Sequence, residues 1–126
     1  MPKIIDLSQS GISAEAFTPP AEKCAAGNPS QLIWNHYTDS AGLFSCGVWQ
    51  GEPCILNVQY GPHEEEFCVL LEGEVLLTGR DGVVHHFKAG AAFVVPGGFV
   101  GTWQNLSTVK KYYAIMLIRD PEQAHL

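Results

Sequence analysis

Apolar residues recur in short runs along this chain, and polar breaks separate the runs roughly every eight to twelve residues. Short runs bounded by Gly, Pro, Asn, Asp and Ser are typical of β-strands joined by turns. The pattern predicts strands over residues 32–36, 44–50, 54–60, 66–71, 74–78, 83–87, 92–95, 99–104 and 111–118. We therefore expect an all-β domain, built as a sandwich or a barrel.

Residues 90–105 are the most informative stretch, because a Pro-Gly-Gly corner separates two apolar runs there. Pro96 fixes its own φ angle, and the glycines after it supply the positive φ that other residues resist. Beyond the corner, alternation places Gly101 and Trp103 on one face of the second strand. Two strands bent around one corner indicate a curved, closed sheet.

Residues 1–31 have a more mixed composition than the rest, so we divide the chain into an N-terminal arm, 1–31, and one barrel domain, 32–126. Within the arm, residues 3–7 are compatible with a short edge strand. Residues 13–17 are compatible with a single helical turn, which Pro19 and Pro20 would end.

The spacing of Gly90, Pro96, Gly98 and Asn105 resembles the second motif of the cupin superfamily, in which a metal-binding histidine also occurs. Gly101 stands at the position of that histidine. The resemblance implies a cupin-type double-stranded β-helix, or jelly-roll barrel, in a single domain.

The first cupin motif ends in a glutamate and a glycine, which Glu66 and Gly73 match. Its two histidines are missing, because their alternative positions hold Tyr60 and Pro62, or Gln59 and Gly61. The stretches GLFSCGVWQGEP, EFCVLLEGEV and AGAAFVVPGGFVGTW are similar to the small cupins grouped with the ureidoglycine aminohydrolases and the ethanolamine-utilisation cupin. The barrel motifs are therefore present, and most of the metal ligands are not.

Charge and cysteine content narrow the class of protein. The net charge of −6 and scattered basic residues argue against binding to nucleic acid or to an anionic membrane surface. The four cysteines form no C-x-x-C pair and no signal peptide is recognisable, so we expect reduced thiols in a cytoplasmic protein. The longest uncharged stretch, 89–109, is broken by Pro96, which argues against a transmembrane helix.

Glu66 is the candidate catalytic residue, because the cupin motif implies that it faces the barrel interior. Alternation then turns Cys68 inward beside it, and Trp103 shares the same cavity. Burial without a partner raises the pKa of a carboxyl group toward neutrality, as a general acid or base requires. The alternatives are a solvated carboxylate at the barrel mouth or a pair with a lysine. Cys68 is expected to be a core thiol, since a nearby carboxylate disfavours a thiolate.

A metal site normally takes three or four ligands around one point, and Glu66 alone matches the cupin pattern. His63 is a candidate pocket residue close to Glu66, and either His85 or His86 must face inward. We nevertheless expect no metal and no cofactor. Gly101 is assigned to the pocket as well, because it leaves space where an imidazole would stand.

The last strand carries two further pocket candidates, Tyr112 and Tyr113, of which alternation turns one inward. The sequence leaves open which one. Lys110 and Lys111 are interpreted as the solvated end of this strand, and Trp49 as a packing or interface residue.

These observations predict a cupin-fold protein that binds a small molecule, or a metal-independent enzyme that acts on a small polar metabolite. One alternative is a metal-dependent enzyme of nitrogen metabolism resembling the ureidoglycine aminohydrolases, with His63 and Glu66 as ligands. Another is a non-catalytic accessory protein. We expect a homodimer formed through sheet edges and the N-terminal arm, and no nucleic-acid or membrane partner.

Overall fold

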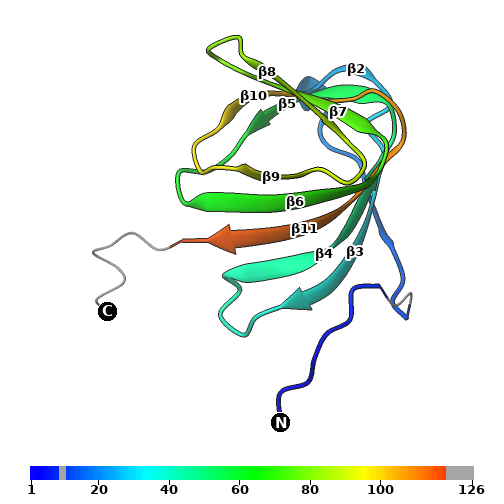
Figure 1. Ribbon diagram of the computed structural model, residues 1–126, viewed down its shortest axis with the longest axis vertical. Helices are drawn as coiled ribbons and strands as arrows, with labels where there is room; N and C mark the ends of the chain where they lie inside the picture. The colour runs from blue at the N-terminus through cyan, green and yellow to red at the C-terminus, as the bar shows by residue number, and fades with distance from the viewer. Residues whose placement is uncertain (9–10, 119–126) are drawn as a thin grey trace.

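The computed structural model describes residues 1–8 and 11–118, which form two antiparallel sheets facing one another. The larger sheet has the strand order β1-β3-β4-β11-β6-β9, and the smaller one has the order β2-β5-β10-β7-β8. Figure 1 shows β3, β4, β11 and β6 side by side as one curved surface, with the smaller sheet arching over one end. The protein is all-β, as the sequence pattern predicts.

The strands are β1 (Glu15–Phe17), β2 (Cys24–Gly27), β3 (Gln31–Thr38), β4 (Phe44–Gly51), β5 (Cys54–Gln59), β6 (Glu64–Glu72), β7 (Glu74–Gly79), β8 (Val84–Lys88), β9 (Ala92–Val95), β10 (Val100–Asn105) and β11 (Val109–Leu117). A 3-10 turn, η1 (Ala21–Lys23), precedes β2. All nine predicted strands are confirmed, as β3 to β11, with bounds that differ by no more than two residues.

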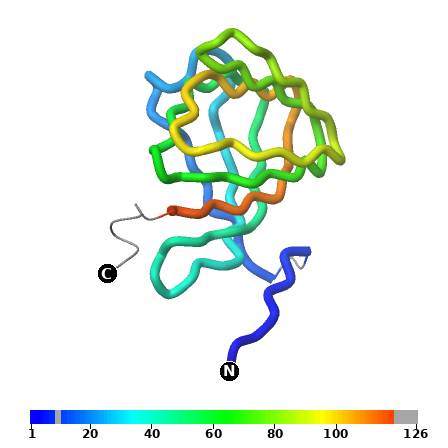
Figure 2. Tube along the Cα trace, turned by 60° about the vertical axis from the view of Figure 1, so that its left-hand side comes forward, coloured from blue at the N-terminus to red at the C-terminus, as the bar shows by residue number. Residues whose placement is uncertain are grey.

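Residues 1–31 differ from two of the expectations. Residues 3–7 form no strand, and residues 13–17 contain β1 instead of a helical turn. β1 pairs with β3 and β2 pairs with β5, because extended backbone at a sheet edge satisfies its hydrogen bonds by joining the sheet. Before these strands, the first residues lead away from the barrel in both Figure 1 and Figure 2. The division of the chain after residue 31 stays a prediction.

The Pro-Gly-Gly corner carries the chain from one sheet to the other. β9 pairs with β6 in the larger sheet, and β10 pairs with β5 and β7 in the smaller one. Gly98 has φ +82°, and a Cβ atom at Gly97 would lie 2.6 Å from the Pro62 carbonyl oxygen. Both positions therefore require glycine, one for its φ angle and one for a close backbone approach.

The core lies between the two sheets and consists of Cys68, Leu70, Val75, Leu77, Val95, Trp103 and Val109. All four cysteines are free thiols, as predicted. Within residues 1–8 and 11–118, no helix is long and apolar enough to cross a membrane.

Candidate functional site

The inner face of β6 presents Glu66, Cys68 and Leu70, whose exposed fractions are 5%, 0% and 1%. Phe67, between them on the opposite face, is 48% exposed. The alternation that the sequence predicts is therefore present, because successive side chains of a strand point to opposite faces of the sheet. Glu66 is a carboxylate in the barrel interior.

Lys111 of the neighbouring strand β11 is the partner of this carboxylate. Its Nζ atom lies 3.0 Å from Glu66 Oε2 and 3.5 Å from Cys68 Sγ. Lys111 is 5% exposed, so its interpretation as part of a solvated strand end is wrong. The inner face of β11 is formed by Val109, Lys111 and Tyr113, and the register of β11 on β6 shifts between Lys110 and Lys111.

The second oxygen of Glu66 accepts a hydrogen bond from Tyr60. The Tyr60 hydroxyl lies 2.5 Å from Glu66 Oε1. Tyr60 stands at one of the positions where the first cupin motif has a histidine. Both carboxylate oxygens are thus bound by protein donors, and the alternative that Glu66 pairs with a lysine is the one that the structure shows.

Two indole rings enclose the ammonium group. Lys111 Nζ lies 4.1 Å from the centroid of the Trp103 ring and 4.9 Å from that of the Trp49 ring. The rings themselves meet edge to face, with centroids 6.1 Å apart. Cation–π contacts of a desolvated ammonium contribute about 2 kcal/mol or more. Trp49, interpreted as a packing or interface residue, is a wall of the site.

Side-chain hydrogen bonds hold both indoles in place. Trp103 Nε1 donates to Asn105 Oδ1 at 2.8 Å, and Trp49 Nε1 donates to Gln31 Oε1 at 2.9 Å. Asn105 Nδ2 in turn donates to the Glu52 carbonyl oxygen at 2.9 Å. The asparagine of the second motif therefore positions Trp103.

The protonation states in this cluster follow from its burial and its charges. Burial acts to lower the pKa of Lys111, but its interactions with Glu66 and Cys68 together more than offset burial, and the net pKa is raised. Burial raises the pKa of the Cys68 thiol to about 12, although the Lys111 ammonium acts in the opposite direction. Burial and the Glu66 charge also raise the pKa of Tyr60. At neutral pH the site therefore holds an ammonium, a neutral thiol and a neutral phenol, and no activated nucleophile.

A cavity of about 300 Å³, which we call the lysine cavity, opens onto this cluster. Tyr60, Glu66, Lys111 and the two indoles contribute to its lining. The other lining residues include the polar side chains of Lys23, Gln31, Asn57, Gln59 and Glu64. The two lysines and two glutamates cancel in formal charge.

The remaining predicted pocket residues lie elsewhere. His63 is exposed in the turn before β6, and Tyr112 lies on the opposite face of β11 from Lys111. Tyr113 is the tyrosine that faces inward, and its hydroxyl donates to Asn35 Oδ1 at 2.6 Å. None of the three lines the lysine cavity.

Gly101 does not open the space that the sequence interpretation gave it. A Cβ atom at residue 101 would lie 2.0 Å from the Thr78 carbonyl oxygen of β7. This glycine therefore permits the close approach of β10 to β7, and it does not line the lysine cavity. A histidine at this position would require the backbone to move.

The donor set does not fit a metal ion of the cupin type. Among the described residues, no group of three or more His, Cys, Asp and Glu side chains is arranged to hold a metal. Glu66 already binds two protein donors, and His63 is exposed in the turn before β6. His85, the inward member of the hairpin pair, lines a different cavity.

Two facing antiparallel sheets, joined by the Pro-Gly-Gly corner and enclosing the glutamate of the first motif, define a protein of the cupin fold. Residues 38–113, more than half of the chain, match the model of the EutQ-like cupin domain family. The chain belongs to this family. The ethanolamine-utilisation part of the predicted resemblance is therefore confirmed, and the ureidoglycine aminohydrolase part stays a prediction.

Solved structures show the same fold at low sequence identity. A DUF861-family protein of unknown function from Pseudomonas syringae superposes with a TM-score of 0.74 at 23% identity, covering 84% of this chain and 45% of that one. A candidate ethanolamine utilization protein Q from Salmonella typhimurium gives 0.64 at 15% identity, covering 85% and 96%. A predicted oxalate decarboxylase from Thermotoga maritima gives 0.67 at 16%, covering 92% and 100%.

The chain thus spans less than half of the length of the Pseudomonas protein. A search of curated proteins finds no significant match. At these identities the solved structures establish the fold alone.

Proposed function

We propose that the protein binds a small, neutral, polar metabolite in the lysine cavity, with the Lys111 ammonium as the fixed positive charge of the site. The observation that carries this proposal is the buried Lys111–Glu66 pair, with a separation of 3.0 Å, at the wall of a cavity. Removing two ions from water costs several kcal/mol per ion, and apolar side chains of similar volume are often equally stabilising. A role in recognition explains why the core contains this pair.

The charge balance of the lining indicates the class of ligand. Lys23 and Lys111 balance Glu64 and Glu66, so the lining has no net formal charge that would attract a cation or an anion. Neutral amides, ureides and polyols match this balance and can bond to the amide side chains of Asn57 and Gln59. The indole walls add planar apolar contact on the other side.

The proposal requires only binding. The same residues could also support a metal-independent reaction of the bound ligand. The buried ammonium of Lys111 can stabilise negative charge that develops on a ligand oxygen. The Tyr60 hydroxyl can still accept a hydrogen bond while it donates to Glu66. Neither group requires a metal for these roles.

The site does not favour a metal-dependent ureidoglycine aminohydrolase-like activity, because the donors do not converge. The accessory role makes a different prediction, namely that no small molecule stabilises the protein. Cytoplasmic location, supported by four free thiols, and homodimer formation, supported by the exposed edge strand β1, belong to the same proposal. Light scattering of the purified protein tests the dimer.

A thermal-shift screen tests the proposed function. Its neutral arm contains urea, allantoin, small amides and polyols. Ethanolamine and oxalate, suggested by the names of the structural neighbours, serve as the cationic and anionic arms. A ligand at about one hundred times its Kd stabilises the native state by about 2.7 kcal/mol.

We expect a neutral compound to raise the Tm of the wild type and to have no effect on a Lys111→Met, Glu66→Gln double variant that still folds. Elemental analysis of the same preparation should find no stoichiometric transition metal. A charged compound as the only stabiliser, an equal shift in the double variant, or a stoichiometric metal bound at Glu66 would each contradict the proposal.

A further inference from the structure

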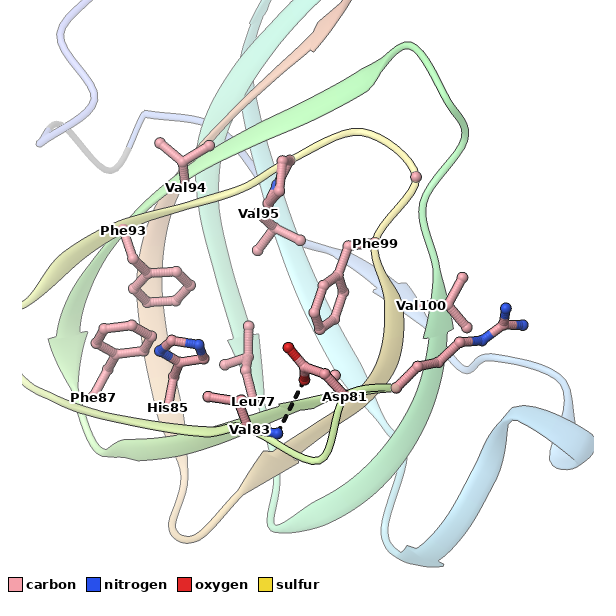
Figure 3. Close-up of a pocket in the computed structure, with 14 residues that line it drawn as sticks. Leu77, Asp81, Val83, His85, Phe87, Phe93, Val94, Val95, Phe99 and Val100 are labelled. Atoms are coloured by element: carbon pink, nitrogen blue, oxygen red, sulfur yellow. Dashed lines mark hydrogen bonds between the residues drawn. The ribbon is translucent and has the colours of Figure 1, made fainter.

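A second cavity, of about 590 Å³, lies between the β7–β8 hairpin and the β9–β10 corner (Figure 3). We call it the hairpin cavity. It shares no lining residue with the lysine cavity. Trp103 lines one and Phe93 lines the other, and these two rings lie 5.8 Å apart. The aromatic core therefore separates two independent spaces.

Three nearly parallel rings form one wall of the hairpin cavity. Phe87 and Phe93 stack with centroids 4.1 Å apart and an interplanar angle of 7°. His85, two residues before Phe87 on the same face of β8, is parallel to it within 6°, at 6.2 Å. Phe93 stacks on the face of Phe87. Among the described residues, the ring contact of His85 is the one with Phe87, beside it on β8. The next inward residue of β9 is Val95, which is too small to cover His85.

The opposite wall and the floor are apolar. Figure 3 shows Phe99 across the cavity from His85, Phe87 and Phe93, with Val95 and Leu77 between the two sides. A flat ring that enters this space meets a ring face on one side and aliphatic or aromatic side chains on the others. Such stacked and edge-to-face contacts between rings add to the stabilisation that area burial provides.

One carboxylate is directed into this apolar space. Asp81 Oδ1 accepts a hydrogen bond from the Val83 backbone N–H at 3.0 Å, which fixes the side chain in the hairpin turn. Figure 3 shows the carboxylate between His85 and Phe99, so its other oxygen can accept from a ligand. Arg80 also lines the cavity, so the lining has no net formal charge. A neutral donor matches this arrangement better than an ion.

We propose that the hairpin cavity is a second ligand site, which binds a neutral, flat aromatic molecule by stacking it against His85 and accepting its N–H or O–H hydrogen bond at Asp81. This site does not depend on the lysine cavity or on any ligand bound there. The polar group orients the ligand, and the rings supply most of the contact area.

Indole and benzofuran form a matched pair of probes, because they have nearly the same shape and differ in an N–H donor. We expect ligand-observed NMR titration to give an indole Kd about tenfold lower than that of benzofuran, which corresponds to about 1.4 kcal/mol, because only indole has an N–H to donate to Asp81. In Asp81→Asn the amide oxygen can keep the Val83 bond and turn the NH₂ group toward the ligand. The preference for indole should then disappear while benzofuran still binds.

Variants of the walls locate the bound probe. His85→Ala and Phe99→Leu should weaken both probes, and Val84→Thr, on the outer face of the same strand, should weaken neither. Circular dichroism and thermal unfolding of each variant establish that it is folded. The proposal fails if neither probe binds, if indole and benzofuran bind equally to the wild type, or if Trp49→Phe in the lysine cavity abolishes binding while His85→Ala does not.

Discussion

Replacing Lys111 by methionine is the sharpest test of the buried cluster. Methionine keeps the length and much of the volume of lysine, so packing changes little, but Glu66 loses its cationic partner. Glu66 and Lys111 are each about 5% exposed, and their charged atoms are 3.0 Å apart. Breaking a buried pair by removing one partner costs about 3–5 kcal/mol, because an uncompensated buried charge remains. For a small domain this is a large share of a total stability of about 5–15 kcal/mol.

Equilibrium urea unfolding at pH 7 measures this loss, and a double-mutant cycle isolates the pair. We expect Glu66→Gln alone to be destabilising as well. The double variant should lose less unfolding free energy than the two single variants lose together. A cost below about 1 kcal/mol, or strictly additive single changes, would refute the description of Glu66 and Lys111 as a buried, coupled pair.

Three further changes test other parts of the structure. Tyr60→Phe removes the hydroxyl that donates to Glu66, and urea unfolding should show a loss of about 1.5–3 kcal/mol; an unchanged midpoint would mean that this bond is not formed. The folded-state pKa of Cys68 is raised from 9.0 to about 12, so its contribution to stability is present below pH 9 and is lost as the pH rises toward 12. The slope of unfolding free energy against pH in this range should therefore be shallower in Cys68→Ala than in the wild type, and equal slopes would contradict the assignment. Gly101→Ala should lower the Tm, because its Cβ would lie 2.0 Å from the Thr78 carbonyl oxygen, whereas Gly11→Ala, with nothing within 4 Å, should leave the Tm unchanged.

Local sequence patterns were sufficient to predict the strand positions and the Pro-Gly-Gly corner. Each strand from β3 to β11 has its own apolar run and its own turn residues, so the prediction needed no knowledge of which strands pair. The inward direction of Glu66 and Cys68 followed from the motif and from alternation along one strand. The alternation of Val109, Tyr113 and Ile115 also placed Lys111 on the apolar face of β11, and this signal was available in the sequence.

The content of the site depended on contacts between distant segments. Lys111 meets Glu66 because β11 lies directly beside β6, and Tyr60 reaches the same carboxylate from the end of β5. Alternation specifies a face of a strand, but it does not specify the neighbouring strand or the side chain opposite. For the same reason the sequence suggested open space at Gly101, where the structure shows the backbone of β7 in close approach.

The sequence by itself therefore determined the all-β class and the strand positions, since these depend on side-chain periodicity and on the φ angles of proline and glycine, and the resemblance to the cupin motif implied that Glu66 faces inward. Only the tertiary structure decided that this acid has a lysine and a tyrosine as partners, and that two separate cavities flank the aromatic core. Those features arise from strand order and register across tens of residues, and no local pattern of polarity encodes them.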